Sequence, residues 1–349
     1  MVFSFDPLDN LPRQLPPRGT RPVPVRRNEP VYQRVSPGGW YEYANSNLVY
    51  YLLLFNMLGA IAHAVGVILT FTQGRTNLTL DVLQTMPVNI GNASHVRLTS
   101  RMDIIYRLHP TTIVGIFFGL SLSFHVVISI FLVAQILLPR SYFTTWYMRC
   151  LYYCVAPSRW LEYFFSASLM LLLTCLLLGL REAHVLYMVT GLMAITITYG
   201  WLTELHSANL IERDDANPYE FCGFMLTRRW VKGSWKTRLQ MHLVGYLPYA
   251  LLWGIVFDRF RINMEVVAEA VPDFVNVATI GSFALFTLFG VVQLANQLFP
   301  YGPSLYWLGE CTYVVLSFAA KANLGFIILF QALVPGGVYD NALGAKFDP

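Results

Sequence analysis

The segment Ser317-Phe-Ala-Ala-Lys321-Ala-Asn-Leu324 places a lysine near the middle of a long apolar run. Ten residues separate Lys321 from Cys311 and thirteen separate it from Val334, so its ammonium group cannot easily reach a membrane surface. An ionisable side chain at this depth costs at least ~2.5 kcal/mol on insertion scales. A buried lysine is stabilised by losing its proton, by pairing with a carboxylate, or by forming an imine whose charge a counterion balances. The segment therefore predicts a functional site inside a membrane protein.

The rest of the chain is also apolar. Of its 349 residues, 55% are hydrophobic and 13% are charged, and the mean hydropathy is +0.49. This composition excludes a disordered chain, a nucleic-acid-binding domain and a polar cytosolic enzyme. Runs long enough to cross a ~30 Å hydrocarbon core predict an all-α membrane protein with seven transmembrane helices in an up-down bundle. The runs are 46–71, 109–138, 157–180, 183–207, 238–258, 273–299 and 304–334.

Lysine and arginine residues are unevenly distributed between the two sides of the predicted bundle. Fifteen lie on the side of the N-terminal tail and eight lie on the opposite side. By the positive-inside rule, the N-terminus is cytoplasmic and, after seven crossings, the C-terminus is extracellular. The predicted organisation is a basic Pro/Arg-rich cytoplasmic tail (1–45), a seven-helix domain (46–335) with an outer loop (72–108), and a short extracellular tail (336–349).

The sequence of the outer loop supports its extracellular position and predicts part of its structure. Asn77-Leu-Thr and Asn92-Ala-Ser are sequons for glycosylation. The apolar residues between Val88 and Leu98 alternate with polar ones, which favours a small hairpin.

The third run offers a partner for Lys321. In Arg159-Trp-Leu-Glu162-Tyr-Phe-Phe-Ser166, Glu162 and Ser166 are four residues apart and share one helix face, and Ser317 lies likewise one turn before Lys321. Counting from the outer ends of the runs places Glu162 about 7 Å nearer the cytoplasm than Lys321, at ~1.5 Å per residue. The long lysine side chain can bridge this offset, so the sequence predicts a buried pair.

These residues resemble a known family. The cytoplasmic N-terminus, the long first outer loop, the R-W-x-E-Y motif at Arg159–Tyr163 and the S-F-A-A-K motif ending at Lys321 are together similar to the heliorhodopsins, retinal proteins with an inverted membrane topology. The resemblance covers roughly residues 40–335 and implies a rhodopsin-like bundle that binds retinal, all-trans in the dark.

The resemblance also implies roles for individual residues. Lys321 would hold retinal as a protonated Schiff base, and Glu162 would be its counterion, because a nearby carboxylate favours the protonated imine. Further residues would surround the imine, transfer its proton or line the retinal pocket. Ser317, Ser121 and Ser166 would lie near the imine, His63 and His125 would exchange protons in a neighbouring cavity, and Phe283, Phe286, Gln293, Met170, Met193, Trp253 and Phe326 would contact retinal.

One position departs from the family pattern, and two carboxylates stand out at helix ends. Gly66 replaces a glutamine that the family often has, which would enlarge or alter the histidine cavity. Glu204 closes the fourth run and Glu310 opens the seventh, both near the cytoplasm. Such residues are usually hydrated, but they are candidate relay groups if the protein moves protons from Glu162.

The favoured hypothesis is a light-sensing retinal protein that is not an enzyme, in which proton movement drives conformational signalling. A light-gated proton conductor of the same family is the alternative. From another class, a seven-helix membrane receptor or hydrolase without chromophore is the alternative. A zinc-dependent hydrolase would need a His/Asp cluster converging on one site, and the sequence has only two clearly intramembrane histidines and no zinc pattern among its five cysteines. A structural scaffold would leave Lys321 unexplained.

Partners follow from composition and from the resemblance. The lipid bilayer is the expected environment of this multi-pass protein, and nothing indicates nucleic acid. The resemblance implies a homodimer with contacts through the outer loop and spans one, four and five. A cytoplasmic signalling partner is consistent with a sensor.

Overall fold

The computed structural model describes residues 47–74, 78–90, 98–138, 144, 146–152, 154–209, 219–221, 224–226, 235–266, 272–298 and 303–333. The two predicted tails and the sequon residues Asn77 and Asn92 lie outside these ranges.

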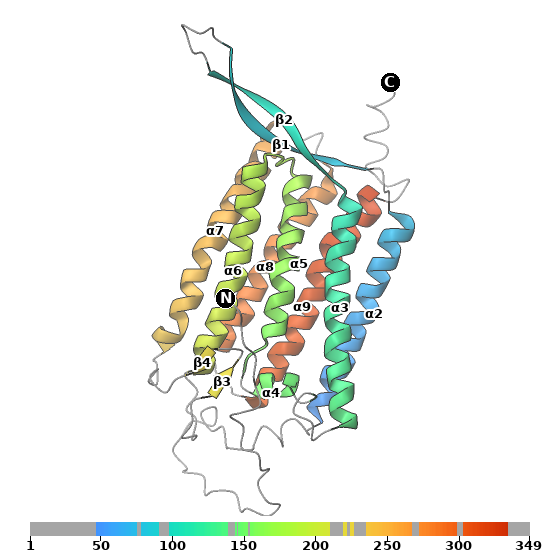
Figure 1. Cartoon of the computed structure of the whole chain (residues 1–349), viewed down its shortest axis with the longest axis vertical. Helices are drawn as coiled ribbons and strands as arrows, with labels where there is room; N and C mark the ends of the chain where they lie inside the picture. The colour runs from blue at the N-terminus through green and yellow to red at the C-terminus, as the bar shows by residue number, and fades with distance from the viewer. Residues whose placement is uncertain are drawn as a thin grey trace, which may run out of the picture.

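Within the described residues, seven helices are long and apolar enough to cross a membrane, and they form one bundle (Figure 1). They are α2 (Leu48–Gln73), α3 (Pro110–Leu137), α5 (Pro157–Leu177), α6 (Ala183–Asn209), α7 (Trp235–Val266), α8 (Asp273–Leu298) and α9 (Pro303–Ile328), which continues into a π-helical turn, η3 (Leu329–Leu333). Each corresponds to one predicted run. The chain is an integral multi-pass membrane protein.

Helix α7 is longer than its predicted run, 238–258. The prediction ended where charged residues begin, but Arg261 bonds to Asp258 and Glu265, which lie three and four residues away on the same helix. These pairs allow the helix to continue beyond its apolar part.

The helices contact one another in the cyclic order α2, α3, α5, α6, α7, α8, α9 and back to α2. Helix α5 is the most buried of the seven. Its residues Met170, Leu171 and Leu173 lie in the main apolar core together with Phe117 and Phe118 of α3. A polar residue on the inner face of α5 is therefore surrounded by protein rather than lipid.

The connection between α5 and α6 is short, as predicted. Gly179 has a φ of +72°, a left-handed conformation that glycine adopts without strain. The Leu180 amide bonds back to the Cys175 carbonyl at 2.9 Å, which ends α5 in a Schellman-type turn. Asn263 of α7 donates to the Leu178 carbonyl at 2.8 Å, so the turn is held from a neighbouring helix.

The outer loop forms a hairpin, which is longer than the one predicted. Strands β1 (Leu80–Asn89) and β2 (Leu98–Leu108) pair antiparallel from Leu80↔Leu108 to Asn89↔Leu98. The Leu83 amide bonds to the Arg181 carbonyl at 2.7 Å, and Val82 joins the main core. The hairpin is thereby attached to the α5–α6 turn and crosses one end of the bundle (Figure 1).

A short helix, α4 (Trp146–Tyr152), lies at the opposite end of the bundle (Figure 1). Tyr147, Met148 and Leu151 of this helix are buried. Seven residues are too few to stand out in a hydropathy pattern, so the sequence analysis did not predict this helix. A small hairpin of β3 (Tyr219–Phe221) and β4 (Phe224–Leu226) was likewise not predicted.

Candidate functional site

Lys321 and Glu162 form an ion pair in the interior of the bundle. The Nζ of Lys321 on α9 lies 3.1 Å from the Oε1 of Glu162 on α5, and the two side chains are 3% and 5% exposed. The predicted depth offset is bridged, so the side chains meet. Because a lone charge is very unfavourable in such surroundings, each group depends on the other to remain charged.

Hydroxyl groups surround this pair. The Oγ of Ser121 on α3 donates a hydrogen bond to Glu162 Oε1 at 2.6 Å. The Nζ of Lys321 donates to the Oγ of Ser317, one turn earlier on α9. Ser166, one turn after Glu162, is also buried. The serines that the sequence analysis selected thus lie around the pair, from three different helices.

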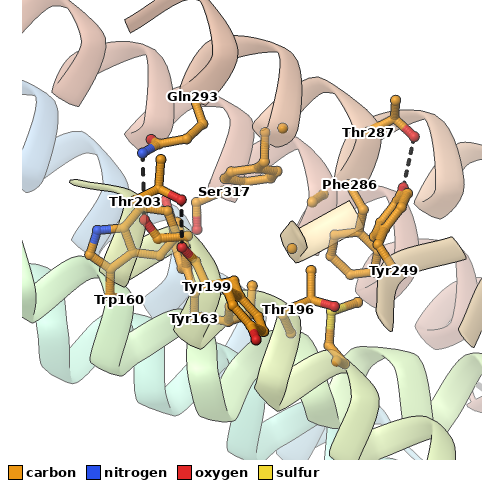
Figure 2. Close-up of a pocket in the computed structure, with 18 of the residues that line it drawn as sticks. Trp160, Tyr163, Thr196, Tyr199, Thr203, Tyr249, Phe286, Thr287, Gln293 and Ser317 are labelled. Carbon is orange, nitrogen blue, oxygen red and sulfur yellow. Dashed lines mark hydrogen bonds between the residues drawn. The ribbon is translucent and has the colours of Figure 1, made fainter. Parts of the chain in front are cut away.

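A cavity adjoins the lysine (Figure 2). Its walls are mainly apolar and aromatic, with a few polar groups among them, as is typical of ligand pockets. The predicted residues that line it are Ser166, Met170, Met193, Phe286, Gln293, Ser317 and Lys321.

Three predicted pocket residues do not line this cavity. Phe283 and Trp253 pack against each other, with ring centroids 5.1 Å apart, behind Phe286. Phe326 packs against Phe118 at 5.4 Å. Their direct contact with a ligand in the cavity is therefore not supported. Aromatic residues make up 15% of the chain, so their position along a helix did not distinguish packing from lining.

Many of the residues that line the cavity were not predicted from the sequence. Tyr249 of α7 bonds to Thr287 of α8 at 2.7 Å on this wall, and Trp160 and Tyr163 also line the cavity (Figure 2). The missed residues of α6 and α7 recur every three to four positions, which is the signal of one helix face. Among them are Thr196, Tyr199 and Thr203 of α6, and His242, Tyr246 and Tyr249 of α7.

The two predicted histidines lie together. The rings of His63 on α2 and His125 on α3 are stacked with centroids 5.2 Å apart. His63 donates from Nδ1 to the Gly59 carbonyl at 2.6 Å, and the Nδ1 of His125 lies 2.9 Å from the Oδ1 of Asn56. The Nε2 of His63 is buried and has no hydrogen-bond partner among the described residues. Since Nδ1 carries the proton, Nε2 is available as an acceptor.

Gly66 does not enlarge this region. A Cβ at position 66 would lie 2.7 Å from the ring of Phe118, so that ring already fills the space beside the glycine. The Phe118 ring thus lies beside the histidines, with its centroid 6.1 Å from that of the His63 ring.

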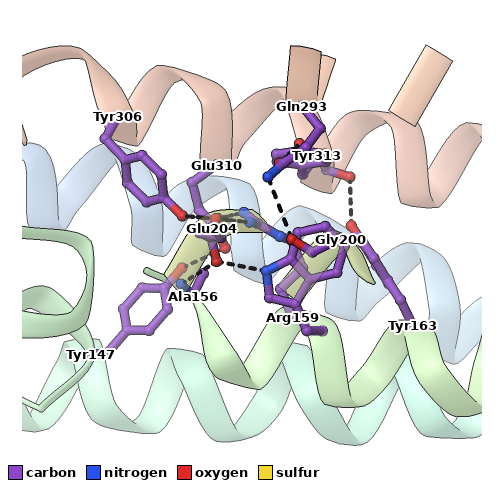
Figure 3. A network of polar contacts seen from close by, with 11 residues as sticks. Tyr147, Ala156, Arg159, Tyr163, Gly200, Glu204, Gln293, Tyr306, Glu310 and Tyr313 are labelled. Carbon is purple, nitrogen blue, oxygen red and sulfur yellow. Dashed lines mark hydrogen bonds and ion pairs between the residues drawn. The ribbon is translucent and has the colours of Figure 1, made fainter. Parts of the chain in front are cut away.

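Glu204 and Glu310 belong to a second buried charged cluster, centred on Arg159 (Figure 3). The Nη2 of Arg159 lies 2.6 Å from the Oε1 of Glu204, and its Nη1 donates to the Oε2 of Glu310. All three side chains are no more than 4% exposed. The expectation that helix-end carboxylates are hydrated is therefore wrong here. Tyr147 of α4 donates to Glu310 at 3.2 Å and covers it from the end of the bundle.

Two tyrosines lie between the cluster and the lysine pair. The Tyr313 ring is 4.0 Å from the Arg159 guanidinium carbon, and the Tyr163 hydroxyl donates to the Tyr313 carbonyl at 3.0 Å. The Tyr163 ring in turn lies 5.4 Å from Lys321 Nζ. The two charged sites are thus separate but linked by packed side chains.

One family of known proteins matches this chain. A family model described as Heliorhodopsin matches residues 52–333, which is more than half of the chain and includes the lysine pair, the histidines and the cluster. A comparison with curated proteins found no match. Among the described residues, no group of three His, Cys, Asp or Glu side chains is arranged to hold a metal ion.

Proposed function

The chain belongs to the heliorhodopsin family, and from this premise we propose that it is a light sensor in which Lys321 holds retinal as a protonated Schiff base with Glu162 as counterion. Family membership makes it a retinal-binding, light-responsive rhodopsin. The observation that carries the finer assignment is a buried lysine amine, 3.1 Å from a carboxylate, at the wall of an apolar cavity lined by aromatic residues.

The residues of the cavity fit a retinoid. The lysine amine is the nucleophile that an aldehyde requires, and the aromatic wall suits a long conjugated hydrocarbon. Met170, Met193 and Phe286 supply apolar contact, whereas Gln293 is hydrogen-bonded to Tyr313 at 2.6 Å and so is satisfied within the protein. When bound, all-trans-retinal supplies light absorption and an isomerisation that changes the shape of the site.

The chain's own residues hold and receive the proton at this site. Glu162 balances a positive charge on the lysine nitrogen, and Ser121 orients the carboxylate by its 2.6 Å bond. The free Nε2 of His63 is the candidate acceptor for a proton that leaves the site, with the ring of His125 beside it. A change of charge at these groups alters helix packing, which is the proposed signal.

Three further features remain part of the proposal. The charge bias of the sequence supports a cytoplasmic N-terminus. A cytoplasmic signalling partner is part of the proposal because a sensor needs a partner to which it passes the signal. The exposed row Met102, Ile104 and Tyr106 on β2 supports a homodimer formed through the outer hairpin.

An absorption spectrum tests the chromophore assignment. Protein expressed with added all-trans-retinal is expected to show a visible band that hydroxylamine bleaches in light. Lys321→Ala removes the amine, and Lys321→Arg is the matched control that keeps the positive charge without an amine able to form an imine. Both are expected to lose the band. A folded parent protein without a band, or a band that persists in Lys321→Arg, would refute the assignment.

A light-gated proton conductor is the second candidate, favoured by one observation. The carboxyl groups of Glu204 and Glu310 lie inside the protein beyond the lysine pair, where protons would pass. Photocurrents recorded under voltage clamp decide between the candidates. A conductor would show steady currents that fall in Glu204→Gln and Glu310→Gln, and a sensor would show none in the parent.

A further inference from the structure

The cluster of Arg159, Glu204 and Glu310 contains one cation and two carboxyl groups. Their side chains are between 3% and 4% exposed, so bulk water does not screen them. With both carboxyl groups ionised, the cluster would carry one uncompensated negative charge in a medium of low dielectric constant, which is strongly unfavourable. One bound proton makes the cluster neutral.

The hydrogen bonds to Glu204 indicate that this carboxylate is ionised. Its Oε1 accepts bonds from Arg159 and from the Tyr306 hydroxyl. Its Oε2 accepts bonds from the Trp160 indole at 2.6 Å and from the Ala156 amide at 2.9 Å. Four donors occupy the roughly four acceptor sites of an ionised carboxylate, so no place is left for a proton.

Glu310 is much less occupied. Its Oε2 accepts a bond from Arg159, and in the described part of the chain its Oε1 accepts a single bond, from the Tyr147 hydroxyl at 3.2 Å. A phenol oxygen both donates and accepts, so a proton on Oε1 could be donated to Tyr147 without moving either side chain. The charge count requires one proton, and the donor count assigns it to Glu310.

A second observation points to a bound proton carrier in the same place. The Nε of Arg159 is buried within the cluster and has no hydrogen-bond partner among the described residues. This unmatched donor is suited to a water molecule that exchanges a proton with Glu310.

From these observations we infer that the cluster is a proton-binding site, in which Glu310 carries one proton in the resting protein while Glu204 stays ionised against Arg159. The site takes up one proton from water and releases it reversibly, with no other reactant. The assignment concerns the protein in the dark, so it stands or falls independently of the signalling role and of proton conduction.

The groups that face Glu310 come from four helices. The titratable or charged side chains that interact with it are Arg159 and Tyr163 of α5, Glu204 of α6, Tyr147 of α4, and Tyr306, Cys311 and Tyr313 of α9. Arg159 is the cation among them, and both carboxyl groups share it.

Infrared spectroscopy of the dark protein tests the inference. The full-length chain, loaded with retinal and labelled with ¹³C at the glutamate carboxyl carbons, is placed in lipid vesicles at neutral pH. We expect the C=O stretching band of a protonated carboxyl group, moved by the ¹³C label and by D₂O. Glu310→Gln, which keeps the size and neutrality of a protonated Glu310, is expected to lose it. No band in the parent, or a band unchanged in Glu310→Gln, would overturn the assignment.

Glu204→Gln tests whether the carboxyl pair holds the proton. Without Glu204, Arg159 has Glu310 alone to pair with, so Glu310 should ionise and the band should disappear. A band that survives in Glu204→Gln would show that burial alone protonates Glu310, and the inference of a shared site would fail.

A pair of milder variants keeps the test decisive if the glutamine variants do not fold. Tyr147→Phe removes the contact to Glu310 Oε1 and should shift the band. Tyr306→Phe is the matched control, because its hydroxyl bonds to Glu204, and it should leave the band frequency unchanged. An unshifted band in Tyr147→Phe, or equal shifts in both, would place the proton elsewhere.

Discussion

Removing one partner of the Lys321–Glu162 pair should destabilise the retinal-free protein far more than removing both. Glu162→Gln leaves an ammonium group that is 3% exposed without its counter-charge, and Lys321→Met leaves the carboxylate alone. The double variant leaves no buried charge. We therefore expect the double variant to be more stable than the effects of the single substitutions predict when added together.

The magnitude follows from the geometry. At 3.1 Å and an effective dielectric constant of about 20, the Coulomb attraction is about 5 kcal/mol. Ser121 and Ser317 continue to bond to whichever charge remains, which offsets part of the loss. Each single variant should lose about 3–5 kcal/mol, as is typical when one partner of a buried pair is removed, and we expect a coupling energy of about 3 kcal/mol.

Unfolding in mixed micelles, titrated with a denaturing detergent and followed by tryptophan fluorescence, gives the four free energies of the cycle. The matched control is Arg261 with Glu265, whose atoms are also close, at 2.8 Å, but whose side chains are each 58% exposed. That cycle should show no coupling above the error of the measurement. A Lys321–Glu162 coupling below about 0.5 kcal/mol, the level found for independent sites, would refute the reasoning.

Two further substitutions test the surroundings of the pair. Ser121→Ala removes the 2.6 Å hydrogen bond to Glu162, which should lower the free energy of unfolding by roughly 1.5–3 kcal/mol and shift the visible band. Ser123→Ala, at an exposed position on the same helix, is the control and should change neither the stability nor the band. Equal spectra for both variants would contradict the role of Ser121. Gly66→Leu places a side chain against the Phe118 ring, 2.7 Å from the new Cβ, and should lower the melting temperature. Adding Phe118→Ala to this variant should restore part of the lost melting temperature. A double variant that melts no higher than Gly66→Leu would argue against this contact.

The seven spans and the lysine pair could be predicted because the bilayer allows few alternatives. An apolar run of about 20 residues can only be a helix in lipid, so its position follows from composition alone. An ionisable residue within such a run is rare and unfavourable, so Lys321 and Glu162 stood out, and each required the other. The serines followed from helical spacing, which brings residues four apart to one face.

The Arg159 cluster could not be predicted in the same way. Glu204 and Glu310 lie near helix ends, where composition cannot distinguish a hydrated carboxylate from a buried one. Their burial depends on α4, whose Tyr147 covers Glu310 and whose seven residues give no hydropathy signal. The cluster therefore exists only through contacts of α4 and α5 with α6 and α9, which follow much later in the sequence. The cavity wall shows the same limit, since Phe283 and Phe286 are one turn apart and only Phe286 faces the cavity.

The two charged sites are close enough to influence each other, and this determines how a light signal could spread. Arg159 and Glu162 are three residues apart on α5, so they lie within one turn of the same helix. If a proton leaves the lysine site and Glu162 loses its counter-charge, the negative charge of Glu162 is left unbalanced within one turn of Arg159. This unbalanced charge makes the surroundings of the cluster more negative, so the proton of the cluster is held more tightly. If Glu162 instead becomes neutral, Arg159 interacts more strongly with the cluster, and the proton on Glu310 is released more easily. The direction of proton movement at the cluster thus reports which group accepts the first proton, a histidine or Glu162.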